Sequence, residues 1–249
     1  MSDTQLVPDR YFELIDHDTE RLLAMGERDL TAQVPCCPGW DVRDVLAHTA
    51  EVYEHKVRVM ADNGWPSPWP PADFADRDPV DLLRQAKADL FEEFARHQPD
   101  EQTTTFSPDD TTITFWMRRM ALEVAIHRYD AELAHGEMSP VPDDLALDGI
   151  DEMLRVMLEV DESEDVPTDH PVEAMVAVEA AGRRWLCDLR ERSVTITTDS
   201  ANPAAATVGG DPAVVFLWLW GRVGDERVER SGDSNVLNGF RGRLVECSQ

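Results

Sequence analysis

Glu123 and His127 are the residues of this chain whose types and spacing most directly suggest chemistry. They stand four positions apart in a stretch whose pattern indicates a helix, and this spacing places both side chains on one helix face. His48, in a second segment with a helical pattern, is a third candidate. Two imidazoles and one carboxylate would hold a divalent cation and leave coordination positions open, which distinguishes a catalytic from a structural site. The alternative for Glu123 and His127 alone is a hydrogen-bonded or salt-bridged pair.

Other polar residues carry weaker expectations. His55 lies seven positions after His48 and would join or replace it, but its charged neighbours predict solvent exposure. Asp130 stands three positions after His127, where it would either orient the imidazole as a hydrogen-bond acceptor or pair in solvent with a nearby arginine. The remaining histidines lie in polar settings or near element ends and are predicted to be surface residues: His17, His97, His135 and His170.

The four cysteines, Cys36, Cys37, Cys187 and Cys247, form neither a disulfide framework nor a CxxC metal pattern. Adjacent cysteines such as the first two seldom bridge each other, because the peptide geometry strains the bond. A cytosolic cysteine is usually an inert small residue. We interpret Cys36 and Cys37 in this way, with a nucleophilic role as the alternative.

The composition argues against several classes of partner. A chain of 249 residues with 42% hydrophobic content can bury a sizeable core, and we expect two domains. A formal charge of −27 and a pI near 4.4 would repel nucleic acid and anionic membranes. The longest apolar run, Val214–Trp220, is far short of the ~20 residues of a bilayer-spanning helix, and the start of the chain lacks a leader pattern. We therefore expect a cytoplasmic protein that is a monomer or a weak homodimer.

Residues 1–160 are predicted to form a helical bundle, because apolar residues recur at helical spacing between start and stop signals. The expected helices run from about Pro8 to Thr31, from Asp41 to Asn63, from Pro79 to near Pro99, and from Thr111 or Thr112 to Gly136. A proline-rich ordered loop is expected over Trp65–Asp76, and a fifth helix over Asp144–Val160. Four amphipathic helices of this kind indicate a four-helix bundle, a scaffold that builds metal sites from facing helices.

Residues 161–249 are predicted to form a small α+β domain after an acidic linker at Asp161–Asp165. Alternating residues over Trp185–Leu189, followed by Val194–Thr198, predict a β-hairpin. The remaining expected elements are a short helix capped by Asp211 and ended by Gly221, a strand around Arg227–Arg230, and a last helix after Asp233.

Three stretches of the sequence together have a familiar order and spacing. They are Cys37–His48 (CPGWDVRDVLAH), Glu123–Glu132 (EVAIHRYDAE), and Leu217–Arg222 (LWLWGR) with the later Gly232-Asp233. In these stretches the chain resembles the mycothiol-dependent maleylpyruvate isomerase-like family, whose N-terminal part belongs to the wider DinB-like group. The resemblance spans nearly the whole chain. It implies a DinB-like four-helix bundle followed by an α+β domain of the sterol-carrier-protein type.

The resemblance also implies a site and a chemistry. His48, Glu123 and His127 would ligate a divalent metal, most often zinc, and Arg222 would bind the substrate's carboxylates. The alternative for Arg222 is a favourable charge at a helix C-terminus. A mycothiol-like thiol bound at the cation would lose its proton near neutral pH. Its thiolate would attack an electrophilic small molecule, in an isomerase of the maleylpyruvate type or in a thiol S-transferase.

Two other functions stay open at this point. A metal-dependent hydrolase would use the same ion to activate water in place of a thiol. A non-catalytic protein that binds a small molecule or a partner would keep the scaffold without turnover. Dependence on a thiol separates the first alternative from the main hypothesis, and a strict requirement for Glu123 excludes the second.

Overall fold

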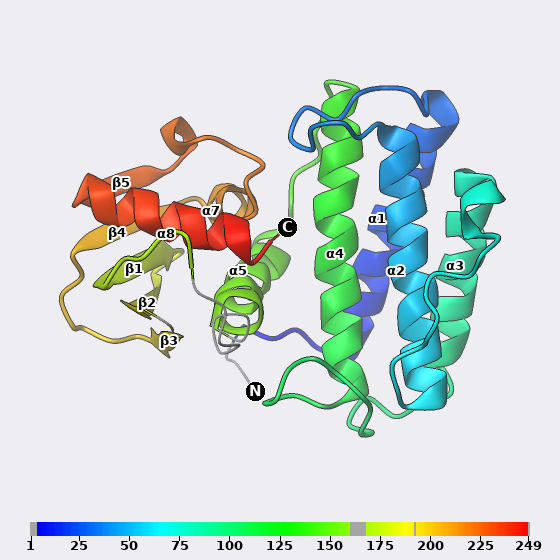
Figure 1. Ribbon diagram of the computed structural model, residues 1–249, viewed down its shortest axis with the longest axis horizontal. Helices are drawn as coiled ribbons and strands as arrows, with labels where there is room; N and C mark the ends of the chain where they lie inside the picture. Colours follow the sequence, from blue (N-terminus) through cyan, green and yellow to red (C-terminus); the bar gives the residue numbers. More distant parts are fainter. Residues whose placement is uncertain (1–3, 160–167, 192, 249) are drawn as a thin grey trace. The chain divides into compact units, whose positions relative to one another are not determined.

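The computed structural model describes residues 4–159, 168–191 and 193–248. The chain divides into two compact units: Leu6–Ser139, here the bundle unit, and Pro140–Gln249 with Met1–Gln5, here the sheet unit. The predicted fold class, a DinB-like four-helix bundle followed by a small α+β domain, is confirmed (Figure 1). The domain boundary predicted between residues 160 and 161, and the linker predicted over 161–165, lie outside the described residues.

The bundle unit consists of four long helices and one short 3-10 turn. They are α1 (Pro8–Arg28), α2 (Val42–Asp62), η1 (Phe74–Asp76), α3 (Pro79–Phe94) and α4 (Ile113–Ala134). The long helices lie side by side (Figure 1), with α1 packed against α4, and α2 packed against both α3 and α4. The pair formed by α2 and α4 matters most here, because these helices carry the candidate metal ligands.

Local chemistry sets the start and the end of α2. Asp41 accepts a hydrogen bond from the Asp44 backbone N–H, while the Asp44 side chain accepts one from the Asp41 backbone, so the two form a capping box. At the other end Asn63 adopts the left-handed conformation with φ of 46°, which asparagine tolerates better than most residues. Both boundaries agree with those predicted from the sequence.

Helix α4 differs from the predicted amphipathic helix, because 18 of its 22 residues are buried. Several of its charged side chains form ion pairs inside the protein. Arg128 is fully buried and forms ion pairs with Asp18 of α1, at 3.2 Å, and with Glu132, at 2.8 Å. Pairing of this kind offsets part of the cost of burying a charge, so α4 can be the central helix without being wholly apolar.

The sheet unit has one five-stranded sheet of order β3-β2-β1-β4-β5. Its elements are α5 (Asp143–Glu152), η2 (Met153–Leu158), β1 (Ala174–Ala180), β2 (Arg183–Arg190), β3 (Ser193–Thr198), β4 (Ala206–Gly210), α7 (Pro212–Leu219), η3 (Asp225–Arg227), β5 (Glu229–Gly232) and α8 (Ser234–Glu246). Strands β1 and β4 are parallel and the other neighbours are antiparallel.

The predicted hairpin is present as β2 and β3, and the predicted short helix as α7, whose cap is Asp211. The segment predicted as a fifth helix is more complex: α5 continues into η2, a π-helical stretch. Strands β1 and β4 were not predicted from the sequence. No helix among the described residues is long and apolar enough to span a bilayer.

Candidate metal centre

The three predicted metal ligands meet between α2 and α4. His48 on α2 and His127 on α4 each place Nε2 at 3.2 Å from the same atom, Oε1 of Glu123. The imidazole rings lie nearly perpendicular, with their centroids 4.8 Å apart. These distances match the edge of about 3.3 Å that a tetrahedron with metal–ligand bonds of about 2.0 Å would have. These two donor–donor distances therefore fit a cation such as zinc, and all three donor atoms lie within 4.8 Å of one another.

Neighbouring side chains hold two of these groups in place. Arg119, one turn before Glu123, donates a hydrogen bond to the other carboxylate oxygen, Oε2. Asp130 lies 3.2 Å from Nδ1 of His127 through Oδ2, and its side chain is fully buried. Of the two roles considered for Asp130, the structure shows the contact with the imidazole and not a solvated position. A carboxylate partner at Nδ1 is the usual companion of a metal-binding histidine.

The electrostatics of the metal-free site favour an ionised carboxylate and a protonated imidazole. Burial opposes the ionisation of Glu123, but Arg119 and His127 hold the pKa of its carboxyl well below the usual value. Burial likewise opposes the charged form of His127, but the carboxylates of Glu123 and Asp130 outweigh it and raise the imidazole pKa to about 9. A cation would replace that proton, since ligation requires neutral imidazole.

The loop before α2 covers the two histidines with an aromatic ring. It is closed by backbone hydrogen bonds from Val34 N to Trp40 O and from Trp40 N to Cys37 O, both 3.0 Å long. The Trp40 ring centroid lies 5.2 Å from that of His48 and 6.4 Å from that of His127, nearly parallel to the latter at 19°. Trp40 therefore restricts the access of solvent to one side of the site.

The same loop brings Cys36 and Cys37 to Asp130. Cys36 Sγ lies 3.1 Å from Oδ1, and Cys37 Sγ lies 3.7 Å from Oδ2. A hydrogen bond with Cys37, burial and the Asp130 charge all raise the pKa of the Cys36 thiol. This contact was missed from the sequence, because Asp130 is more than ninety positions away from both cysteines. The only signal was that Cys37 opens the motif that ends at His48.

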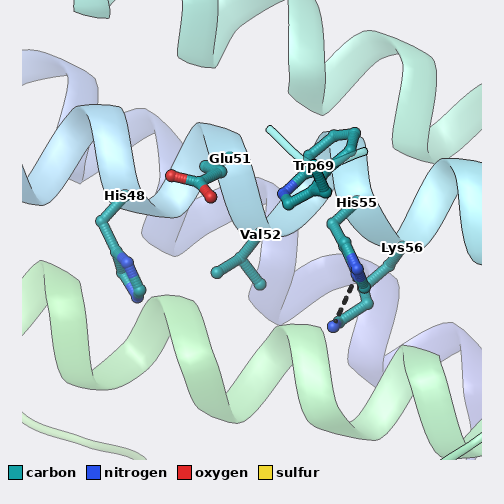
Figure 2. Close-up of a pocket in the computed structure, with 6 residues that line it drawn as sticks. All are labelled: His48, Glu51, Val52, His55, Lys56 and Trp69. Atoms are coloured by element: carbon teal, nitrogen blue, oxygen red, sulfur yellow. Dashed lines mark hydrogen bonds between the residues drawn. The ribbon is translucent and has the colours of Figure 1, made fainter. Parts of the chain in front are cut away.

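A small cavity of about 210 Å³ adjoins the site along α2 (Figure 2). Its lining residues are His48, Glu51, Val52, His55, Lys56 and Trp69. His55 is not part of the metal triad. Burial and the adjacent Lys56 lower its pKa to about 4. Trp69, from the proline-rich loop, is the one residue of that loop that lines this cavity.

Lys56 is the cation of this cavity. Its Nζ lies 3.0 Å from Nδ1 of His55 and 4.9 Å from the ring centroid of Trp116. Burial lowers the pKa of Lys56 to about 8, an effect that the charge of Glu123 opposes. No carboxylate pairs with Lys56 among the salt bridges of the described residues. Its ammonium group therefore remains available to an anionic ligand.

The fourth predicted site residue, Arg222, lies in the sheet unit just after α7. Its backbone N–H donates to the carbonyl of Leu217 and its side chain donates to the carbonyl of Trp220, at 2.8 and 2.7 Å. These bonds tie Arg222 to the end of α7, as expected for a charge at a helix C-terminus. Its predicted role in substrate binding stays a prediction.

The comparison with protein families agrees with the resemblance read from the sequence. Residues 12–132 match the family model described as the mycothiol maleylpyruvate isomerase N-terminal domain. The bundle unit belongs to this family. The crystal structure of the mycothiol-dependent maleylpyruvate isomerase matches the chain with a TM-score of 0.63 and 15% identity, covering 93% of this chain and 96% of that chain.

Two further solved structures resemble the chain to different degrees. A His-to-Ala mutant of the same isomerase matches with a TM-score of 0.62 and 14% identity, over 93% of this chain and 96% of that chain. At these identities the likeness shows the isomerase fold alone. A UbiJ-SCP2 ubiquinone synthesis protein matches with a TM-score of 0.30 and 20% identity, over 40% of this chain and 88% of that chain. A score this low does not establish a shared fold, so the sterol-carrier-protein type of the sheet unit stays a prediction. No curated protein matched the sequence.

Proposed function

We propose that this protein is a metal-dependent enzyme in which a mycothiol-like thiol attacks an electrophilic small molecule, with isomerisation of the maleylpyruvate type as the reaction. One observation carries the proposal: Oε1 of Glu123 is equidistant, at 3.2 Å, from Nε2 of His48 and Nε2 of His127. This is the donor set of a catalytic zinc site. It occurs in a domain whose family is named for a mycothiol-dependent isomerase.

His48, Glu123 and His127 would hold the cation, and a zinc ion there would lower the pKa of a thiol that enters its open position. The chain's own residues prepare this position. Arg119 holds Oε2 of Glu123, which leaves Oε1 directed at the histidines. Asp130 accepts a hydrogen bond from Nδ1–H of His127, and this fixes the tautomer whose Nε2 carries a free lone pair.

The cavity beside His48 is where we place the electrophile. Its volume of about 210 Å³ is below the 300–1,000 Å³ typical of sites for drug-sized ligands, so it suits a compact substrate. Lys56 supplies a positive charge that would attract a carboxylate. The indole of Trp69 and the side chain of Val52 provide apolar walls, which would limit the water that competes with the thiol.

The reaction needs only the thiol and the electrophile. The thiolate sulfur adds to one carbon of the cis double bond, and the π electron pair moves onto the conjugated carbonyl. The former double bond is now single and can rotate. Return of the electron pair re-forms the double bond in the trans geometry and expels the thiolate. In a thiol S-transferase the same attack would instead displace a leaving group, and the carbon–sulfur bond would remain.

The test is thiol-dependent conversion of maleylpyruvate to its trans isomer by zinc-loaded protein, with mycothiol present or omitted. Glu123→Gln removes a ligand charge at nearly constant volume. Its matched control is Glu137→Gln, because Glu137 is exposed and its side chain pairs with Arg28 on the surface. We expect turnover that requires mycothiol, is lost in Glu123→Gln and is retained in Glu137→Gln.

Other outcomes would favour the other functions. Accumulation of a stable thioether, detected by mass spectrometry, would indicate S-transfer. Turnover of an ester or amide without thiol would indicate a hydrolase. Wild-type protein that contains no metal, even after incubation with zinc, would overturn the proposal and favour a non-catalytic binding protein.

A further inference from the structure

We infer that Cys36, Cys37 and Asp130 form a second cation site, for a thiophilic divalent metal, beside the His48–Glu123–His127 triad. One ligand atom from each of these three residues lies within 4.8 Å of the others. The triad and this cysteine site are the two such groups among the residues that the structure describes. The inference does not depend on the catalytic role proposed for the triad.

The geometry of the cysteine site fits metal ligation. Side chains of adjacent residues usually point to opposite sides of an extended chain, but here both sulfur atoms converge on one carboxylate. The sulfur–oxygen distances are 3.1 Å from Cys36 to Oδ1 and 3.7 Å from Cys37 to Oδ2. They bracket the separation of about 3.5 Å expected between a thiolate and a carboxylate oxygen on a tetrahedral zinc ion.

The chemistry of the donors selects the class of ion. Two thiolates and a carboxylate would place three negative charges around the cation, and soft sulfur ligands favour zinc or cadmium over magnesium or calcium. Asp130 is fully buried, whereas both cysteines are partly exposed. The buried side of the site therefore supplies a fixed ligand, and the partly exposed side leaves room for water or another ligand.

The two sites share one connection. Oδ2 of Asp130 contacts both Nδ1 of His127, at 3.2 Å, and Sγ of Cys37, at 3.7 Å. A cation at the cysteine site would draw this carboxylate towards itself and change its hydrogen bond with His127. Occupancy of the cysteine site should therefore alter the affinity of the triad for its own metal, and linkage requires the reverse effect to be equal.

The experiment is a Cd²⁺ titration of reduced, metal-free protein, followed by metal content and by the ultraviolet charge-transfer absorption of cadmium–thiolate bonds. We expect wild type to bind two equivalents and to develop the absorption. Glu123→Gln should bind one equivalent with the absorption retained. The double variant Cys36→Ser, Cys37→Ser should bind one equivalent without it, and the control Cys247→Ser should behave as wild type. Wild type without the absorption, or a double variant that keeps it, would overturn the inference.

A measurement on wild type alone keeps the test decisive if the double variant fails to fold. Iodoacetamide labelling can be mapped to each cysteine by peptide mass spectrometry, with and without Cd²⁺. Because a metal-bound thiolate is a poorer nucleophile, labelling of Cys36 and Cys37 should slow by about tenfold or more. Labelling of Cys247 should not change. Equal labelling of Cys36 and Cys37 in both conditions would refute the site.

Discussion

Oδ2 of Asp130 lies 3.2 Å from Nδ1 of His127, one turn along the same helix. The contact lies in the interior of the bundle unit, because Asp130 is fully buried and His127 is almost fully buried. A buried carboxylate at Nδ1 leaves the other ring nitrogen directed towards Glu123, where it would face a cation if one were bound. We therefore expect Asp130 to influence how strongly the triad would bind a metal.

Replacement of Asp130 by Asn should weaken metal binding at the triad. The amide keeps the shape but lacks the charge that supports the imidazole, and loss of such a partner typically lowers metal affinity by about 10- to 100-fold. The measurement is zinc affinity by competition with a chelator, in the Cys36→Ser, Cys37→Ser background so that only the triad is titrated. Asp89→Asn, at a partly exposed residue of α3 that bonds to Gln85, is the control. Equal affinities of the two variants would contradict the role given to Asp130.

The stability of the metal-free protein should fall as the pH rises towards 9. The imidazole of His127 has its pKa raised from 6.5 to about 9, so its charged form stabilises the fold. That contribution is fully present below pH 6.5 and is lost as the pH passes through 9. Urea unfolding midpoints at several pH values would measure it. The decline should be smaller in His127→Gln, and a wild type without any decline would refute the prediction.

Lys56→Met should impair the binding of an anionic electrophile more than the chemical step. Without the ammonium group, KM should rise by about tenfold, because a charge-assisted contact contributes about 1.5 kcal/mol or more, while kcat changes little. The pKa of about 8 means that Lys56 loses its charge above pH 8, so the wild-type KM should also rise there. Steady-state kinetics between pH 6.5 and 9.5 would show this. In Lys56→Met the increase of KM with pH should disappear. Lys87→Met is the control. An unchanged KM in Lys56→Met would remove the residue from the substrate site.

Arg128→Leu should destabilise the bundle unit strongly. The substitution leaves Asp18 and Glu132 without their buried cation, and such a loss costs about 3–5 kcal/mol. The free energy of unfolding, from urea titration, is the measurement. Arg84→Leu is the matched control, because Arg84 pairs on the surface with Glu27 and Asp81, and surface pairs contribute about 1 kcal/mol at most. A similar loss in both variants would show that the buried pair has no special importance.

The helices could be predicted because the residues that start and end them lie close to them in the sequence. Asp41, Asp78, Asp211 and Asp233 each cap a helix within three residues of their own positions, and such signals are visible in sequence. Strands β1 and β4 were missed because their sequences, AMVAVEA and ATVGG, are rich in alanine or glycine, which disfavour strands. Pairing with neighbouring strands stabilises them, and pairing is not a local property.

In the candidate site, too, local relationships could be predicted and contacts between distant segments could not. The spacing of Glu123 and His127 is local to one helix and was predicted. His48 was a candidate from its residue type and helical segment, and the family resemblance made it part of a defined ligand set, because seventy-five positions separate it from Glu123. The contacts of Cys36 and Cys37 with Asp130 depend on how the loop before α2 folds over α4. The spacing of residues in the sequence does not predict this.

Helix α4 is buried along most of its length and holds Glu123 and His127, whereas the cavity is lined from α2 and the proline-rich loop. This separation has a consequence for how the protein can diverge. Substitutions at Glu51, His55 or Trp69 would reshape the cavity without altering α4, which carries Glu123 and His127. Related proteins could thus acquire new substrates through substitutions at these three positions while His48, Glu123 and His127 stay the same. Directed evolution of this scaffold should begin with libraries at those positions and leave α4 unchanged.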